Sequence, residues 1–276
     1  LVRPDGESVP VLMAAALLEK DVLVAFVLDV SRQKRAEEER TRLLEEREAD
    51  LRFLEMFMGM LGHDLRNPLA AVKVSADLLR LSPPGADLGS VIDRIASSAQ
   101  RMDRMVEQLL DITQIRLAGG VPLFQRDADL GEICFHAVEE IKTAHPGVVI
   151  DLQTEGDLTG EWDNDRMLQV VSNLVGNAVQ HGRRGGAVDV RASDRRDWVE
   201  LYVHNEAVIP DEVLPSIFDP FKRIGAREKK GSLGLGLFIS RHIVDRHGGS
   251  IEVQTSAETG TSFKVRLPRK AQAGES

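Results

Sequence analysis

A seven-residue repeat of apolar side chains constrains the first third of this chain. Six apolar residues recur at steps of seven, and two more fill the second seam position: Leu44, Leu51, Met58, Leu65, Val72 and Leu79, with Leu54 and Leu61. Such a repeat predicts one long helix over 32–81 that packs its seam against another helix. The dense charge over 32–52 favours a parallel dimer stalk over a helix packed within one chain.

A second helix is predicted after the breaker Ser82-Pro83-Pro84-Gly85. Over 88–117, apolar side chains alternate at steps of three and four and form an almost unbroken stripe. Two striped helices joined by a short loop form an antiparallel hairpin. Because one hairpin cannot bury both stripes, we expect two chains to form a four-helix bundle.

Composition excludes several classes of protein. The length of 276 residues is enough for about two folded domains. The hydrophobic fraction of 42% is enough for a packed core. The net charge of −9 argues against a nucleic-acid partner. The single cysteine, Cys134, rules out an internal disulfide framework. No apolar run reaches the roughly 18 residues of a membrane span, so we expect no membrane contact within this fragment.

The flanking segments have different patterns. Val9–Met13 and Val22–Leu28 are apolar runs of strand length, separated by a charged turn at Glu19–Asp21. From Val121 onward, short strand patterns, the first at Pro122–Gln125, alternate with helices that begin at Asp129 and Asp163, and several strands follow one another directly. This order predicts an α+β domain with helices on one face of a mixed sheet.

The long helix carries a compact chemical unit, Gly62-His63-Asp64-Leu65-Arg66-Asn67-Pro68. His63 and Asn67 are four residues apart and share one helix face. A neutral imidazole nitrogen is a nucleophile, and Asp64 is placed to take the proton from the other ring nitrogen. The alternative is an ordinary surface histidine that takes part in no reaction.

Three further motifs in the second half suggest a nucleotide site. Asn173 and Asn177 share the polar face of an apolar helix, where an amide oxygen can serve hydrated Mg²⁺. The glycines of Gly231–Leu237 let a backbone approach phosphates at a helix start. Phe218–Arg223 supplies two aromatic anchors and two cations before a polar stretch, 224–230, with the composition of a mobile lid.

The order and spacing of these motifs, with Gly260-Thr261 after them, resembles the sensor histidine kinases of two-component signalling over about residues 32–268. The resemblance implies a multidomain protein: an α-helical dimerisation hairpin followed by an α+β ATP-binding sandwich of the gyrase, Hsp90 and histidine kinase type. It implies a homodimer that uses ATP and Mg²⁺, with the receiver domain of a response regulator as partner. It also implies a bacterial, cytoplasmic location, with any membrane anchor upstream.

The resemblance also implies roles for individual residues. His63 is the phosphoacceptor, Asp64 its general base, and Asn67 orients water for dephosphorylation of the partner. Asn177 is the Mg²⁺ ligand. The remaining nucleotide-binding residues are Asn173, His181, Asn205, Lys222, Arg223, Ser232, Leu233, Gly234, Leu235, Gly236 and Thr261.

Domain boundaries follow from the same reading. Residues 1–31 resemble the C-terminal end of a PAS sensor domain, 32–120 form the coiled-coil linker and phosphotransfer hairpin, and 121–276 form the catalytic ATP-binding domain.

The chain departs from the family pattern in three places. Gln180 stands where a phosphate-binding Lys is common, Ser232 replaces one glycine of the lid loop, and the adenine motif is altered. Where the family has Asp-x-Gly-x-Gly to read adenine, this chain has Asn205-Glu206-Ala207-Val208-Ile209. A neutral amide oxygen accepts a hydrogen bond more weakly than a carboxylate, so we expect weaker ATP binding than the family norm and a gain on restoring Asp at 205.

Two alternatives to an active kinase remain. The altered adenine motif suggests a catalytically weak ATP-binding scaffold, a pseudokinase that uses the same dimer. A gyrase-like or Hsp90-like ATPase without a phosphoacceptor is the other, although it would have no use for His63 on an upstream helix.

Overall fold

The computed structural model describes residues 6, 8–19, 22–83, 87–117, 120–183, 185–222 and 233–270. The chain divides into two compact units, 1–62 and 63–276, and helix α1 (Ser31–Leu81) runs through the division.

The first unit begins with a two-stranded antiparallel sheet. Strand β1 (Val11–Glu19) pairs with β2 (Val22–Asp29), with Ala15 opposite Ala25. The second expected strand is confirmed. The first begins two residues later than expected and continues to Glu19, which was expected in the turn; Lys20 and Asp21 lie outside the described residues. The Asp29 carboxylate then accepts a hydrogen bond from the Ser31 backbone N–H at 2.8 Å and so starts helix α1.

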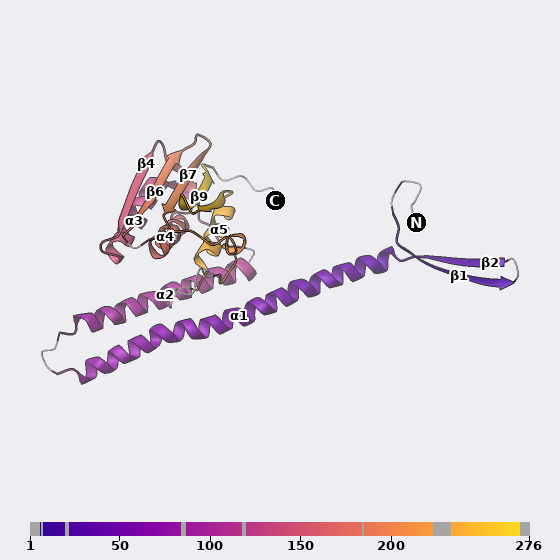
Figure 1. Ribbon diagram of the computed structural model, residues 1–276, viewed down its shortest axis with the longest axis horizontal. Helices are drawn as coiled ribbons and strands as arrows, with labels where there is room; N and C mark the ends of the chain where they lie inside the picture. Colours follow the sequence, from indigo (N-terminus) through magenta and orange to yellow (C-terminus); the bar gives the residue numbers. More distant parts are fainter. Residues whose placement is uncertain are drawn as a thin grey trace. The chain divides into compact units, whose positions relative to one another are not determined.

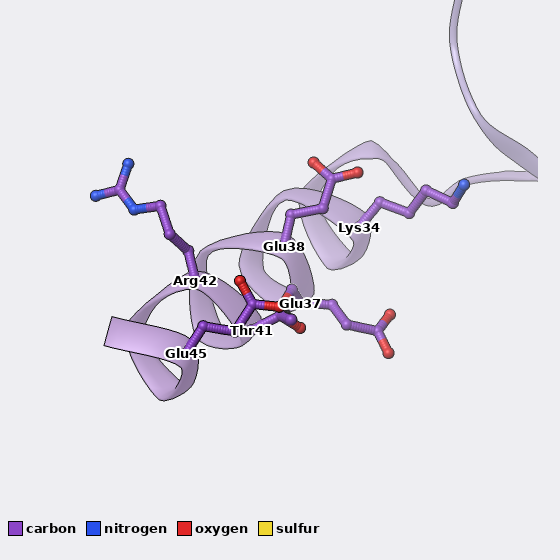
Figure 2. A pocket seen from close by; sticks show the side chains of 6 residues that line it. All are labelled: Lys34, Glu37, Glu38, Thr41, Arg42 and Glu45. Carbon is purple, nitrogen blue, oxygen red and sulfur yellow. Dashed lines mark hydrogen bonds between the residues drawn. The ribbon is translucent and has the colours of Figure 1, made fainter. Parts of the chain in front are cut away.

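Helix α1 confirms the predicted helix to within one residue at its start. It continues through Pro68 without interruption. In the first unit the seam residues Leu44, Leu51 and Met58 are exposed by more than half. The hollow drawn in Figure 2 lies on the charged first turns of α1, and all of its lining residues project from that one helix. We assign no binding site to it.

In the second unit, helix α2 (Gly89–Leu117) follows α1 and returns alongside residues 63–81 (Figure 1). The predicted stripe of α2 is covered along its length, and Met105 and Ile112 are buried. Ser75 of α1 is also buried. The helical hairpin is therefore confirmed.

The rest of the second unit is an α/β sandwich. Its main sheet has the order β4-β6-β7-β9-β8, with β4 and β6 parallel and the other pairs antiparallel. The strands are β4 (Val149–Glu155), β6 (Ala187–Asp194), β7 (Trp198–Asn205), β8 (Ser250–Ser256) and β9 (Gly260–Pro268).

Three helices pack against this sheet. They are α3 (Leu130–Ala144), α4 (Asn164–His181) and α5 (Gly236–Arg246), and a short 3-10 turn, η1, spans Leu214–Ser216. Burial alternates strictly along β7, so one face of the strand meets the helices. The predicted sandwich of helices on a mixed sheet is confirmed (Figure 1).

The expected strand at 122–125 is wrong. The chain there is not a strand, and the Phe124 N–H donates to the Asp163 carboxylate at 2.8 Å. Instead, β3 (Arg126–Asp129) pairs antiparallel with β5 (Thr159–Trp162), which the sequence pattern did not indicate. Three of the four β3 residues are charged, so this strand has no apolar signature.

His247 joins two helices inside the sandwich. Its Nδ1 faces the Ile243 carbonyl oxygen at 2.7 Å, and because a carbonyl only accepts, Nδ1 carries the proton. Its Nε2 therefore accepts from the Asp163 N–H, at 3.0 Å. Burial lowers the pKa of His247, and the Ile243 hydrogen bond and the nearby Asp163 carboxylate only partly oppose this.

The pH dependence of stability follows from this shift. A depressed His pKa means that the contribution is complete above the unfolded value of 6.5 and is lost as pH falls below it. We expect the free energy of unfolding to fall between pH 6.5 and 5, and His247→Gln to remove much of that slope. Denaturant titrations at several pH values measure it. The exposed His145→Gln is the control and should keep the slope; an equal slope in both variants would contradict the assignment.

Candidate nucleotide-binding and phosphoacceptor site

The candidate adenine site begins at Asn205, the last residue of β7. It lies on the core face of the strand and is 6% exposed. Its Nδ2 donates to the Ala178 carbonyl oxygen of α4 at 2.8 Å. Its Oδ1 is buried and has no hydrogen-bond partner among the described residues. An unpaired buried acceptor is costly, so this oxygen is a candidate for a ligand's donor.

Gly260 and Thr261 support Asn205 from the neighbouring strand. Thr261 pairs with Asn205 across β9 and β7, and its hydroxyl donates to the Ala207 carbonyl at 2.7 Å. Gly260 has a φ of 73°, and a Cβ there would collide with the Asn205 backbone oxygen. Glycine is therefore required at 260, because the backbones of β9 and β7 approach closely there, and this close packing holds the end of β7 in place.

The polar face of α4 carries the next predicted residues. Asn173 Nδ2 lies 3.4 Å from the Gly236 carbonyl oxygen and 3.3 Å from Ser240 Oγ, at the start of α5. Asn177 is half-buried, and among the described residues its side chain makes no hydrogen bond. His181 is the last residue of α4 and is also half-buried.

The start of α5 is suited to phosphates. Its N-cap residue, Leu235, supplies no side-chain hydrogen bond, so the first backbone N–H groups have no side-chain acceptor. Leu233 and Leu235 are buried and anchor the loop. Gly234 has a φ of 66°, and a Cβ there would lie 2.6 Å from the Lys222 carbonyl oxygen.

Residues that flank the predicted lid meet at Gly234, while the lid itself, 224–230, lies outside the described residues. The Phe221 N–H donates to the Gly234 carbonyl at 2.9 Å, and Phe221 has a φ of 65°. Lys222 is exposed beside this contact. Arg223 and Ser232 lie outside the described residues.

These contacts join most of the predicted nucleotide residues into one region. Asn173 contacts the start of α5, and Ala178 is five residues further along α4. Asn205 donates to Ala178, and Thr261 is paired with Asn205. Motifs separated by up to 88 positions thus meet where α4, α5, β7 and β9 end or begin.

The phosphoacceptor motif lies on α1. His63 is a helical residue whose side chain lies outside the described residues. Asp64 is 2% exposed. Asn67 Nδ2, one turn further along, is buried and has no hydrogen-bond partner.

A polar contact between the hairpin and the sandwich was not predicted from the sequence. Asp111 of α2 is 4% exposed, and its two carboxylate oxygens lie 2.6 Å from Arg166 Nη1 and 2.6 Å from Gln169 Nε2, both on α4. Arg166 Nη1 also donates to Gln169 Oε1 at 3.0 Å. The only sequence signal is a charged residue beside Ile112 in the apolar stripe of α2.

Two kinds of feature are absent from the described residues. No described helix is long and apolar enough to cross a membrane. Within the same residues, no group of three or more His, Cys, Asp or Glu side chains is arranged to hold a metal ion.

Two family models match the chain in the expected order. The His Kinase A (phospho-acceptor) domain matches residues 53–117. The histidine kinase-, DNA gyrase B-, and HSP90-like ATPase matches residues 162–271.

Two curated relatives are similar to this chain over about four fifths of its length. The bacteriophytochrome of Pseudomonas aeruginosa is 35% identical over 229 residues, which cover 82% of this chain and 31% of that protein. The sensor histidine kinase TrcS of Mycobacterium tuberculosis is 36% identical over 234 residues, covering 80% of this chain and 45% of TrcS. The chain thus spans less than half the length of both.

Among solved structures, histidine kinase ThkA in complex with the response regulator protein TrrA aligns with a TM-score of 0.57 and 25% identity, over 91% of this chain and 71% of that one. The chain thus carries two domains in the order found in histidine kinases, a phospho-acceptor helical hairpin followed by the ATPase domain.

Asp111 offers a test of the contact between hairpin and sandwich. Removing one partner of a buried ion pair leaves an uncompensated charge, which costs roughly 3–5 kcal/mol. We expect Asp111→Ala to lower the free energy of unfolding by about 3 kcal/mol, measured by denaturant titration. Asp103→Ala, at an exposed position of the same helix, should change it by less than about 0.5 kcal/mol; equal losses would mean that the contact contributes nothing.

Proposed function

We propose that this chain is an ATP-dependent protein-histidine kinase that phosphorylates His63 and passes the phosphoryl group to an aspartate of a response regulator. The observation that carries this proposal is the buried Asn205 oxygen, which has no hydrogen-bond partner among the described residues, in a chain that also holds a phospho-acceptor domain; helix α4 links Asn205 to the start of α5, whose N-cap residue makes no side-chain hydrogen bond. That arrangement fits the two ends of a nucleotide and supplies an acceptor for its phosphoryl group.

ATP and Mg²⁺ fit the residues of the site. Asn205 Oδ1 would accept from the adenine amino group. The phosphates would bind along the backbone of Gly234, Leu235 and Gly236. Added Cβ atoms at the two glycines would crowd Lys222 and Asn173. The other residues that we assign to the phosphates are Leu233, His181 and Lys222, with Ser232 and Arg223 from outside the described residues. Asn177, whose side chain has no competing hydrogen bond among the described residues, would supply the Mg²⁺ ligand. Bound Mg²⁺ would neutralise phosphate charge.

The transfer needs little covalent chemistry from the protein. His63 Nε2 would attack the γ-phosphorus, the P–N bond forming as the bond to the ADP oxygen breaks. Asp64, the next residue along α1, would take the proton from Nδ1 and keep the imidazole nucleophilic. Because the P–N bond is labile, the phosphoryl group can then move to a carboxylate of the receiver domain.

The partner reactions rest on two further observations. The ThkA structure that aligns with this chain contains a response regulator. Asn67 Nδ2, buried and unpaired one turn after His63, would orient water when the regulator is dephosphorylated.

The chain organisation proposed from the sequence is retained. We propose that β1 and β2 are the C-terminal end of a PAS-like domain within 1–31, that 32–120 is the phosphotransfer segment, and that 121–276 is the catalytic domain. The relatives are bacterial, and we propose that this part of the protein works in the cytoplasm, where ATP is available.

The pseudokinase alternative is not favoured. Both matched domains belong to histidine kinases, and the His63, Asn177 and Gly234 positions of the motifs are intact. The phospho-acceptor domain also separates this chain from ATPases of the gyrase and Hsp90 kind.

The kinase proposal predicts labelling of one residue. Incubation of the chain with γ-labelled ATP and Mg²⁺ should give acid-labile, base-stable label. We expect His63→Gln to abolish it without changing ATP affinity, because His63 is the acceptor, and Asn177→Ala to reduce it at least 100-fold through loss of the metal ligand. Label that persists in His63→Gln would identify a different acceptor, and a parent that binds ATP without labelling would support the scaffold.

The proposed homodimer is supported by exposed apolar side chains on both helices of the hairpin. Leu69, Val74, Leu78, Ile92, Val106 and Leu110 are each exposed by 43% or more. Burial of such side chains against a second copy would stabilise a four-helix bundle.

The dimer is tested on the α1 seam. We expect the unmodified chain to be dimeric by light scattering. Leu51→Glu should weaken dimerisation at least tenfold, because each chain then places a charge in the apolar seam between the two helices. Arg52→Glu introduces the same side chain one residue off the seam and should leave the dimer intact. An unchanged mass for Leu51→Glu would remove the seam from the interface.

A further inference from the structure

Asn205 has only one amide orientation open to it. The Ala178 carbonyl oxygen can only accept hydrogen bonds, and it already accepts from the Gly182 N–H at 2.9 Å. The Asn205 atom that lies 2.8 Å from it must therefore be the donor, Nδ2. This leaves Oδ1, buried and unpaired, as the atom offered to a ligand.

The surroundings hold the side chain in this orientation. Asn205 is 6% exposed. A Cβ on Gly182 would lie 2.6 Å from the Ala178 oxygen, so this turn of backbone is close-packed. Behind Asn205, Gly260 lies against its backbone and Thr261 is its paired residue on β9. A buried side chain held on these sides cannot exchange its donor for its acceptor without losing the Ala178 bond.

We propose that this nucleotide site is built around an amide, so that Asn205 is a specificity-determining residue that aspartate cannot replace. The inference rests on the proposed function and adds the role of the Asn205 amide in recognising the base. Its oxygen is a fixed acceptor that selects a base with an exocyclic amino group, as in adenine, over one with a carbonyl or a hydrogen in that place.

The reason is the charge on the atom that faces Ala178. An ionised aspartate at 205 would set a carboxylate oxygen against the carbonyl oxygen at the present 2.8 Å, inside a buried site. The side chain would have to turn away or take up a proton. A protonated aspartate reproduces the amide, with an O–H donor toward Ala178 and an oxygen acceptor toward the base.

The charged groups around this position are few in the described part of the chain. Glu206 follows Asn205 and lies 3.7 Å from Arg183, and both are largely exposed. His204 is on the opposite face of β7, 3.4 Å from Asp189. His181 ends α4. Asn205 Nδ2 contacts the Ala178 carbonyl oxygen directly, at 2.8 Å, and this contact decides how a carboxylate at 205 would behave.

The expectation for Asn205→Asp is thus the reverse of the one from sequence alone. Family resemblance predicts tighter ATP binding for Asp. The Ala178 contact predicts that, at pH 8, Asn205→Asp binds Mg·ADP at least tenfold more weakly than the parent, and that the deficit shrinks as pH is lowered toward 6 and the new carboxyl becomes protonated.

Titration calorimetry of the full chain tests this with two probes, Mg·ADP and the magnesium complex of purine riboside 5′-diphosphate, which lacks the amino group. The parent should prefer ADP by about tenfold, the loss expected for one hydrogen bond. Asn205→Ala should show no preference. Gln254→Glu, which adds the same charge at an exposed position of β8, should bind as the parent does.

The outcomes separate the two proposals. Equal or tighter binding of Mg·ADP by Asn205→Asp at pH 8 overturns the amide site while leaving the proposed function in place. Failure of the parent to bind either probe overturns the proposed function and the amide site with it. Thermal unfolding of the nucleotide-free variants provides an independent readout: Asn205→Asp should melt below the parent at pH 8, with the gap closing at pH 6, and a constant gap would contradict the inference.

Discussion

The hydrogen bond from Asn205 to the Ala178 carbonyl is the interaction on which the site depends. It joins the last turn of α4 to the end of β7 in a region from which water is excluded, where an unmade bond is costly. Thr261 and Gly260 fix the same point from β9. Once α4 is held there, the position of Asn173 and Asn177 on its polar face follows, and Asn173 meets the start of α5.

The second constraint is the contact between hairpin and sandwich. Asp111 uses both carboxylate oxygens on donors from α4, the helix that carries the candidate Mg²⁺ and phosphate residues. A buried ionic contact defines one geometry strongly, yet its charges are readily solvated when it opens. Such a contact suits two domains that meet in a defined orientation and separate again, as the proposed phosphotransfer requires.

Periodicity predicted most of the fold. The heptads of α1, the stripe of α2 and the capped helices at Asp129 and Asp163 all depend on local patterns that a single sequence displays. Strand β3 was missed because its residues are polar and its pairing with β5 is decided 30 residues away. The Asp111 contact joins residues 55 and 58 positions apart through side chains without a repeat. The role of Asn205 depends on a backbone carbonyl, which no residue type reveals.

We propose that nucleotide binds where α4, α5, β7 and β9 meet. The decisive experiment is hydrogen exchange of the full chain, read by mass spectrometry with and without Mg·ADP. We expect slower exchange on binding in three segments, 173–182, 203–207 and 233–240, with α3 unchanged. Protection confined to other segments, or exchange unaltered at saturating nucleotide, would contradict it.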